Sequence, residues 1–170
     1  MIDVSKSKET IKDLVHSGKN DDLVLQHSQK DELGITHNFY QQLYKGIKVE
    51  NAMYAAHSKN GYIESVNGKF LKIGEVETSA KISEKEALDR ALNATQAYTY
   101  KWQLNEEEQL IKKVKNDESA TFFPRGELVI LYSQATNSYR LSYKFDIFAH
   151  YPLSHNNVFI DAITGEVLEK

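Results

Sequence analysis

Histidines are the residues of this chain that could do metal or acid–base chemistry, because imidazole binds zinc and titrates near neutral pH. The sequence has six of them: His16, His27, His37, His57, His150 and His155. None is followed by Glu, so the His-Glu-x-x-His pattern, which binds zinc and supplies a general base on one helix, is missing. The histidines therefore do not predict a zinc-protease active site.

His37 and His57 are the pair that neighbouring strands could bring together, depending on the turn at Lys45-Gly46. A two-residue loop places His37 opposite Tyr54 and leaves His57 further along on the other face. A three-residue loop puts both on one face, about 7 Å apart along the strand. Neither register holds both imidazoles on one ion without a third ligand, so we interpret the pair as structural and hydrogen-bonded.

His150 and His155 flank Tyr151-Pro152 and give only a loose His-x-x-x-x-His spacing, which we interpret as two surface histidines. The chain has no cysteine, which excludes disulfides, thiolate metal sites and a cysteine nucleophile. Its glycines form no phosphate-binding cluster, and no serine lies in a Gly-x-Ser-x-Gly elbow. No constellation supports an enzyme in its own right, and we expect no cofactor and no metal.

Composition predicts a globular chain of one ordinary domain or two small ones. Of its 170 residues, 41% are hydrophobic and 26% are charged. The net charge of -3 argues against a nucleic-acid partner, which usually requires a concentrated basic face. No apolar run approaches the roughly 20 residues of a membrane span. The polar stretch 1–10 lacks the apolar core of a secretory signal.

The first half reads as a short helix followed by antiparallel strands. The helix has Ile11, Leu14 and Val15 on one face and ends at Gly18. A brief strand follows at 23–25, and a longer one is indicated by alternating apolar residues, namely Ile47, Val49, Met53 and Ala55. Asn60-Gly61 predicts a type I′ hairpin turn. The charged stretch 74–81 breaks the pattern and is the expected linker.

The second half repeats this plan. Ser83 and Glu86 form a capping-box pattern that predicts a helix start. The apolar face of that helix comprises Ala87, Leu88, Ala91, Leu92, Thr95 and Tyr98. Residues 105–118 predict a solvated connection or a short exposed helix. A half-buried strand is indicated by Tyr139, Leu141, Tyr143, Phe145 and Ile147, and further strands follow at 158–161 and 167–168. We therefore expect an α+β fold of two units, each with a helix packed on a curled antiparallel sheet.

Residues 31–70 contain an ordered set of motifs: Leu33-Gly34-x-Thr36-His37, Gln41-Gln42, Lys45-Gly46, His57 and Val66-Asn67-Gly68. In order and spacing they resemble the FTP segment of fungalysin- and thermolysin-type zinc protease propeptides. Glu50-Asn51 departs from that family, which usually has an apolar residue and Gly there. Further on, 161–167 resembles the close of a PepSY domain, with 124–128 and 139–141 similar to its middle. Asp161 is expected to accept backbone N–H groups while Gly165 takes positive φ.

The resemblance implies an FTP domain at 1–75 and a PepSY domain at 76–170, both cystatin-like. It implies the propeptide region of a secreted zinc metalloprotease, which acts as intramolecular chaperone and inhibitor of its own catalytic domain. The inhibitory contacts would lie at the end of the second domain, at Val167, Leu168, Glu169 and Lys170. The signature residues are expected to determine the fold: His37, Gln42, Gly46, His57, Asn67, Gly68, Asp161 and Gly165.

An alternative from another class stays open. The chain could be a free-standing exported protein of the secretions or cell envelope that regulates a protease in trans or binds a cell-wall component. Composition does not separate these two functions.

Overall fold

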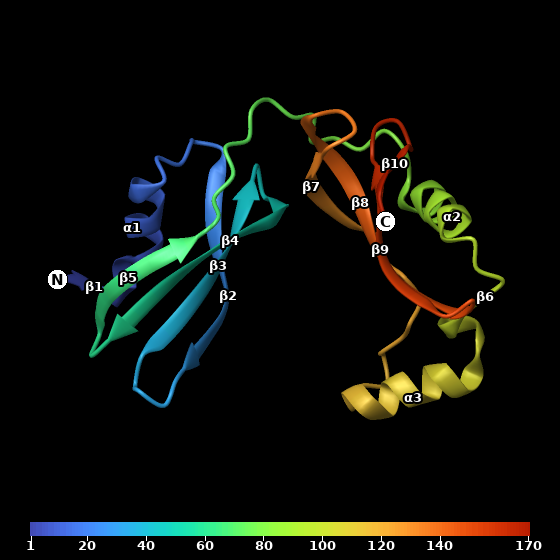
Figure 1. Cartoon of the computed structure of the whole chain (residues 1–170), viewed down its shortest axis with the longest axis horizontal. Coiled ribbons are helices and arrows are strands. Elements are labelled where there is room, and N and C mark those ends of the chain that lie inside the picture. Colours follow the sequence, from blue (N-terminus) through green and yellow to red (C-terminus); the bar gives the residue numbers. More distant parts are fainter. The chain divides into compact units, whose positions relative to one another are not determined.

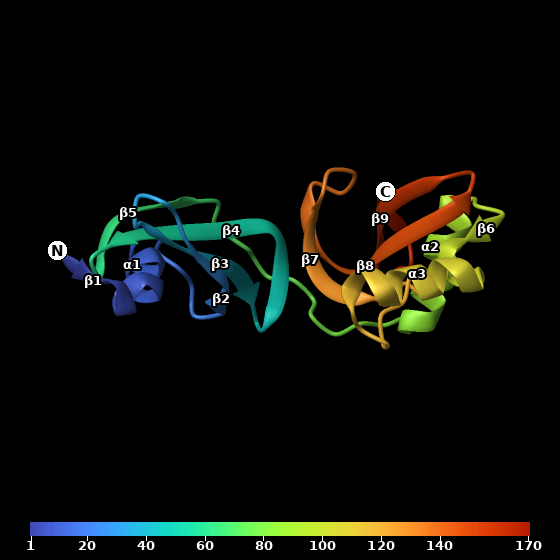
Figure 2. The same cartoon turned by 90° about the horizontal axis from the view of Figure 1, so that it is seen from below.

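The computed structural model describes residues 1–170. They divide into two compact units, Met1–Thr78 and Ser79–Lys170 (Figures 1 and 2), close to the boundary expected after residue 75. Both units are α+β, and in each a helix packs on an antiparallel sheet, as expected. No helix has the length and apolar character needed to cross a bilayer.

The first unit is a meander of long strands with one covering helix (Figure 1). Neighbouring strands pair antiparallel in the order β2-β3-β4-β5-β1. Its elements are β1 (Ile2–Asp3), a 3-10 turn (Val4–Lys6), α1 (Ser7–Leu14), β2 (Asp21–Lys30), β3 (Thr36–Tyr44), β4 (Ile47–Lys59) and β5 (Tyr62–Gly68).

The core of the first unit lies between α1 and the sheet, where Ile11 is fully buried with Leu23, Tyr40 and Ala56. Two expectations for the helix were wrong. Leu14 is 56% exposed, so only Ile11 and its neighbour Val15 face the sheet. The helix ends at Leu14 rather than Gly18, because His16 takes a left-handed conformation with φ 50°.

Strand β4 also departs from the expected alternation, since Met53 is 41% exposed while Val49 is fully buried. A register shift between Val49 and Met53 turns the side chains that follow it to the opposite face of the sheet. At its far end the Asn60-Gly61 turn has φ of 52° and 83°, which confirms the predicted positive-φ hairpin.

The second unit has a four-stranded antiparallel sheet in the order β7-β8-β9-β10, with short β6 paired to β8. Helix α2 covers it through contacts with β8, β9 and β10. The elements are α2 (Glu84–Thr95), β6 (Thr99–Tyr100), a 3-10 turn (Lys101–Gln103), α3 (Asn105–Lys115), β7 (Glu127–Ser133), β8 (Ser138–Tyr151), β9 (Ser154–Asp161) and β10 (Val167–Glu169).

Helix α2 begins as predicted, with the Ser83 hydroxyl accepting a hydrogen bond from the Glu86 N–H. The Glu86 carboxylate pairs with Arg90. Ala87 and Ala91 are fully buried. Tyr98 was placed wrongly on the apolar face: it lies beyond the helix end and is 82% exposed.

Helix α3 has no buried residue, which confirms the exposed helix expected in 105–118. Its attachment is polar, because the Glu108 carboxylate accepts hydrogen bonds from the Thr121 hydroxyl and the Phe122 N–H. Strand β8 shows the alternation predicted for it, with Phe145 and Ile147 fully buried between exposed or partly exposed neighbours.

Gly68 yields a first prediction, because an added Cβ would lie 2.4 Å from the Met53 carbonyl oxygen and 2.6 Å from the Tyr54 Cα, at φ 147°. We expect Gly68→Ala to destabilise the first unit by more than about 2 kcal/mol, since backbone atoms cannot yield. The measurement is urea unfolding followed by hydrogen exchange of β4 and β5 amides. Gly74→Ala is the control, because that site has no contact within 4 Å, and it should be neutral.

Candidate functional site

The centre of the first unit is an irregular pairing between β3 and β4. The Lys45-Gly46 turn joins the two strands, and Tyr44 pairs with Ile47 across it. Its two residues have φ of 48° and 81°, so the second position favours a glycine such as Gly46. Leu43 then pairs with Lys48 while Gln41 pairs with Met53, so Gln42 alone lies opposite residues 49–52. These residues form a β-bulge that shifts the register of everything beyond it.

Asn51 makes this bulge possible, because its φ of 59° is left-handed. Asn is among the few non-glycine residues that adopt this conformation at low cost. The departure noted at Glu50-Asn51 is therefore conservative for the backbone, since Gly and Asn both suit positive φ.

Gln41 fills the bulge from the inside. Its Nε2 lies 2.7 Å from the Val49 carbonyl oxygen, 2.9 Å from that of Ala52 and 3.0 Å from that of Gln42. The side chain is 5% exposed, so it supplies donors to carbonyls that the broken ladder leaves without partners. The bulge is thereby held in one conformation.

The bulge overturns the register expected for a two-residue loop, which would place His37 opposite Tyr54. The loop has two residues, yet His37 lies directly opposite His57, and Tyr54 lies opposite Tyr40. The Nδ1 atoms of the two imidazoles are 2.6 Å apart, and the rings meet edge to face. The prediction failed because it assumed a regular ladder between the turn and the histidines.

The histidine pair is the middle of a longer polar chain. Asn67 Nδ2 lies 3.0 Å from His57 Nε2, and His37 Nε2 lies 3.2 Å from Asp31 Oδ2. Asp31 also accepts hydrogen bonds through Oδ1 from the Leu33 and Ile35 N–H groups, at 2.9 and 2.8 Å. This chain of hydrogen bonds links β5, β4, β3 and the β2–β3 turn.

Those hydrogen bonds set the charge state of Asp31. The Ile35 N–H, together with the bonds from His37 and the Leu33 N–H, holds the pKa of this carboxyl below its ordinary value of 3.8. Asp31 is therefore a carboxylate at neutral pH and a fixed acceptor for His37.

Gln42 has a different task, since it anchors the chain that leaves the sheet. Its Oε1 accepts from the Leu71 N–H at 2.9 Å, and its Nε2 donates to the Leu71 carbonyl oxygen at 2.7 Å and to Asp21 at 3.1 Å. The side chain is fully buried. It fastens both the start of β2 and the segment after β5.

The predicted hairpin at Asp161 is confirmed in the second unit. Asp161 Oδ1 accepts from the Ile163 and Thr164 N–H groups at 2.7 and 2.9 Å, and Gly165 has φ 78°. Arg140, which the sequence argument passed over, binds the other carboxylate oxygen through Nε and an Nη at 2.7 and 2.6 Å. Asp161 is fully buried, so this pairing compensates its charge.

The proposed inhibitory end, Val167 to Lys170, is largely an edge strand rather than a free tail. Val167 pairs with Ile160, Leu168 packs against the cluster of Val129, Leu131 and Phe159, and Lys170 Nζ donates to the Ala94 carbonyl oxygen at 3.2 Å. Val167 remains 46% exposed. The outer edge of β10 carries no further strand of this unit.

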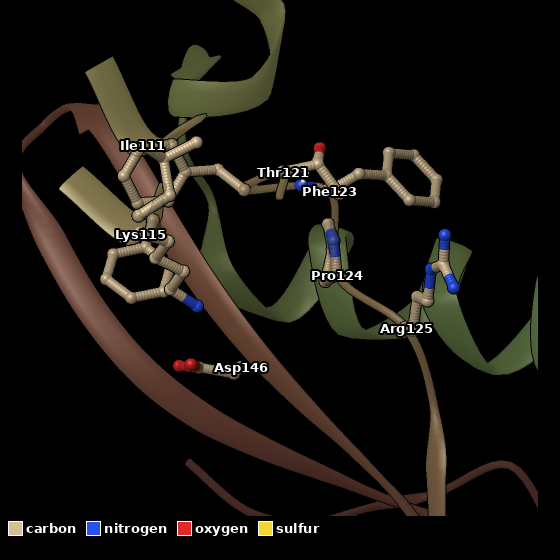
Figure 3. A pocket seen from close by; sticks show the side chains of 9 residues that line it. Ile111, Lys115, Thr121, Phe123, Pro124, Arg125 and Asp146 are labelled. Carbon is tan, nitrogen blue, oxygen red and sulfur yellow. Dashed lines mark hydrogen bonds between the residues drawn. The ribbon is translucent and has the colours of Figure 1, made fainter. Parts of the chain in front are cut away.

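A small cavity of about 190 Å³ opens between the end of α3, the segment 121–125 and β8 (Figure 3). Lys115 and Asp146 lie on one side of this cavity, and Pro124 and Arg125 lie on the other side. Its apolar walls include Ile111, Phe122 and Phe148. Asp146 is paired with His155 at 2.5 Å. The cavity has the size of one side chain, and its lining includes no nucleophile with an adjacent base.

His150 and His155 each have a local partner. His155 stacks on Phe148 at 3.8 Å, and His150 lies 3.9 Å from Glu107. No group of three or more His, Cys, Asp or Glu side chains is arranged to hold a metal ion.

The sequence argument did not predict the contacts that Asp31, Gln41 and Arg140 make in the site, nor the left-handed conformation of Asn51. Asp31 had a readable signal, because an Asp two residues before Leu33-Gly34 is typical of a side-chain-capped turn. Gln41 and Arg140 had none, since their partners depend on the register between strands: Gln41 bonds across the β3–β4 bulge and Arg140 bonds to Asp161 of β9.

Comparison with known proteins finds a family match within the first unit. Residues 21–70 match the family model for the Fungalysin/Thermolysin Propeptide Motif, FTP. Among solved structures, the chain is similar to the Bacillus megaterium YpeB C-terminal domain, with 15% identity over 97% of this chain and a TM-score of 0.43. The match spans 62% of that chain. A likeness at this level adds nothing about function.

Gln42 provides a second prediction. Gln42→Ala leaves the Leu71 N–H and carbonyl group without their buried partner, so we expect a loss of about 2–4 kcal/mol of stability in the first unit. Chemical denaturation with hydrogen exchange of β2 and β3 amides measures it. Gln29→Ala, on the exposed part of β2, is the matched control and should change stability by less than about 0.5 kcal/mol. Equal effects would contradict the anchoring role.

Asp31 provides a third prediction, on pH. Because its pKa is lowered in the folded state, its stabilisation is complete above the unfolded value of 3.8 and is lost as pH falls through the lower folded value. We expect Asp31→Asn to be less stable than the wild type at pH 7, with the difference vanishing in this acidic range. Thermal unfolding from pH 7 to pH 2 measures both proteins. A difference independent of pH would show that the carboxylate charge has no role.

Proposed function

We propose, from the FTP motif that residues 21–70 carry, that this chain is the propeptide region of a secreted zinc metalloprotease. In this role it assists folding of the catalytic domain and keeps the folded enzyme inactive until the junction between them is cut. Such a chain works outside the cytoplasm, in the secretions or the cell envelope. Its partner is the catalytic domain of its own precursor.

The second unit is proposed to be a PepSY domain that follows the FTP domain. Support comes from the Asp161 hairpin, which has the local geometry that the motif requires and is fixed by Arg140. The catalytic domain would come after this unit in the precursor.

The chaperone role requires a surface that is formed before the partner folds. Both units supply one, because their strand registers are held by buried side chains rather than by contact with a partner. Gln41 and Gln42 do this in the first unit, and Asp161 in the second. A preformed template lowers the entropy cost of ordering a partner on it.

The inhibitory contact is proposed at β10 and the residues around it. Val167 is exposed on an edge strand, and edge strands bind extended segments by adding backbone hydrogen bonds. Tethering to the catalytic domain raises the effective concentration of this contact, so a modest affinity suffices.

A fourth prediction tests this function with the cognate mature protease and its unfolded catalytic domain. The purified chain should slow peptide cleavage by the mature enzyme at micromolar concentration, and it should increase the active yield when the catalytic domain refolds from guanidinium. Val167→Asp should weaken inhibition at least tenfold, because it places a charge on the contact edge. Val114→Asp, on exposed α3, is the matched control and should inhibit like the wild type.

The outcomes separate the functions. Absence of both effects would contradict the propeptide role. Inhibition without any gain in refolding would favour a regulator that acts in trans. Equal inhibition by both variants would exclude β10 as the contact. The fluorescence of Trp102, the only tryptophan, reports whether each variant retains its second unit.

A further inference from the structure

The polar chain from Asn67 to Asp31 lies on the face of the first sheet that α1 leaves uncovered. His57 follows Ala56, and Ala56 points into the core beneath α1, so His57 points away from the helix. His37 lies opposite it on β3 and is 20% exposed. Water and protons therefore reach the pair without unfolding of the core.

The hydrogen-bond pattern assigns one arrangement of hydrogens in which both rings are neutral. Asn67 donates to His57 Nε2, His57 donates from Nδ1 to His37 Nδ1, and His37 donates from Nε2 to Asp31. Each neutral ring carries one hydrogen, and each donor meets one acceptor. The 2.6 Å contact between the two Nδ1 atoms contains one hydrogen.

One extra proton fits this arrangement. It binds His57 Nε2 when the Asn67 amide turns to present its oxygen, and the contact between the two Nδ1 atoms is unchanged. A second extra proton does not fit, because it must bind His37 Nδ1 and would face the N–H of His57 across 2.6 Å. Two hydrogens cannot share that line, and the two positive rings would repel each other.

Few other charges can compensate for two imidazolium rings. Asp31 contacts only His37, and it already accepts two backbone N–H groups. The other titratable residues nearby on the paired strands are His27 and Lys30 on β2, Lys59 on β4 and Glu64 on β5. Three of these four carry or can gain positive charge, so they do not favour the doubly charged pair.

We propose that His37 and His57 form an acid-sensitive latch of the first unit, closed while the pair carries at most one extra proton and opened when both rings are charged. Opening separates β3 from β4 at the end of the sheet that holds the β2–β3 turn. The proposal concerns the stability of this unit, and it holds whether or not the chain acts on a protease.

The sign of the pH dependence follows from the proton count. Separated imidazoles take up a proton near pH 6.5, so below about pH 6 the open state binds two protons where the closed pair has room for at most one. The state with more protons is favoured by acid. The equilibrium constant for opening should therefore rise at least about tenfold for each pH unit below about 6.

The fifth prediction tests the latch in the full chain, in buffer with EDTA. Hydrogen exchange of β3 and β4 amides, corrected for the intrinsic pH dependence of exchange, gives the opening constant from pH 7.5 to 5. Amides of the β7–β8 pair serve as an internal reference, since the second unit lacks such a histidine pair. We expect the β3–β4 opening constant to rise at least about tenfold per unit below pH 6 while the reference changes little.

Variants separate a latch from a merely structural role, because the readout is the pH slope and not the stability. In His57→Asn only His37 remains beside Asp31, so acid should no longer increase opening. His27→Asn is the matched control: this ring stacks on Phe39 at 4.4 Å, outside the chain, and the variant should keep the wild-type slope. Equal slopes in the wild type and His57→Asn would overturn the proposal.

A second measurement stands if His57→Asn does not fold. NMR of the wild-type imidazoles reports directly when each ring becomes charged. The latch requires that protection of the β3–β4 amides near His37 and His57 is lost as the second proton binds. Two charged rings with full protection at pH 5 would overturn it.

Discussion

The shift of register between β3 and β4 is the constraint on which the rest of the first unit depends. Asn51 turns the backbone of β4 into a left-handed conformation, and the Gln41 amide bonds to the carbonyls that this frees. Neither residue alone specifies the bulge. The backbone needs the left-handed conformation of Asn51, and the carbonyl groups that lose their strand partners need the amide donor of Gln41. Together they decide which side chains meet along the remaining length of both strands.

The meeting of His37 and His57 is the main consequence of that register. The pair joins Asp31 and Asn67 into a chain of hydrogen bonds across three strands and a turn. Most polar contacts of this fold involve amides and carboxylates, whose charge does not change near neutral pH. Imidazole is the side chain whose charge can change in that range. In the proposed latch, this pair is the place where bound protons loosen the pairing of β3 with β4.

The rest of the chain has a small cavity and exposed apolar side chains. The cavity beside Lys115 and Arg125 has room for one side chain, and exposed apolar residues lie on α3 and on the edge strand β10. Polar anchors at Gln42 and Asp161 hold the backbone of each unit without a partner. In the proposed function, this combination supplies a preformed surface for the catalytic domain.

The sequence by itself determined the α+β class, the two-unit plan, the hairpin at Asn60-Gly61, the start of α2 at Ser83 and the closed turn at Asp161. These features depend on residues close together in the chain, whose conformational preferences are local. It also showed the FTP motif. Only the tertiary structure decided the partners of His37, Gln41 and Arg140, because each contact depends on the register between paired strands and not on local conformational preference. A single bulge, invisible in the alternation of apolar residues, changed which of them face one another.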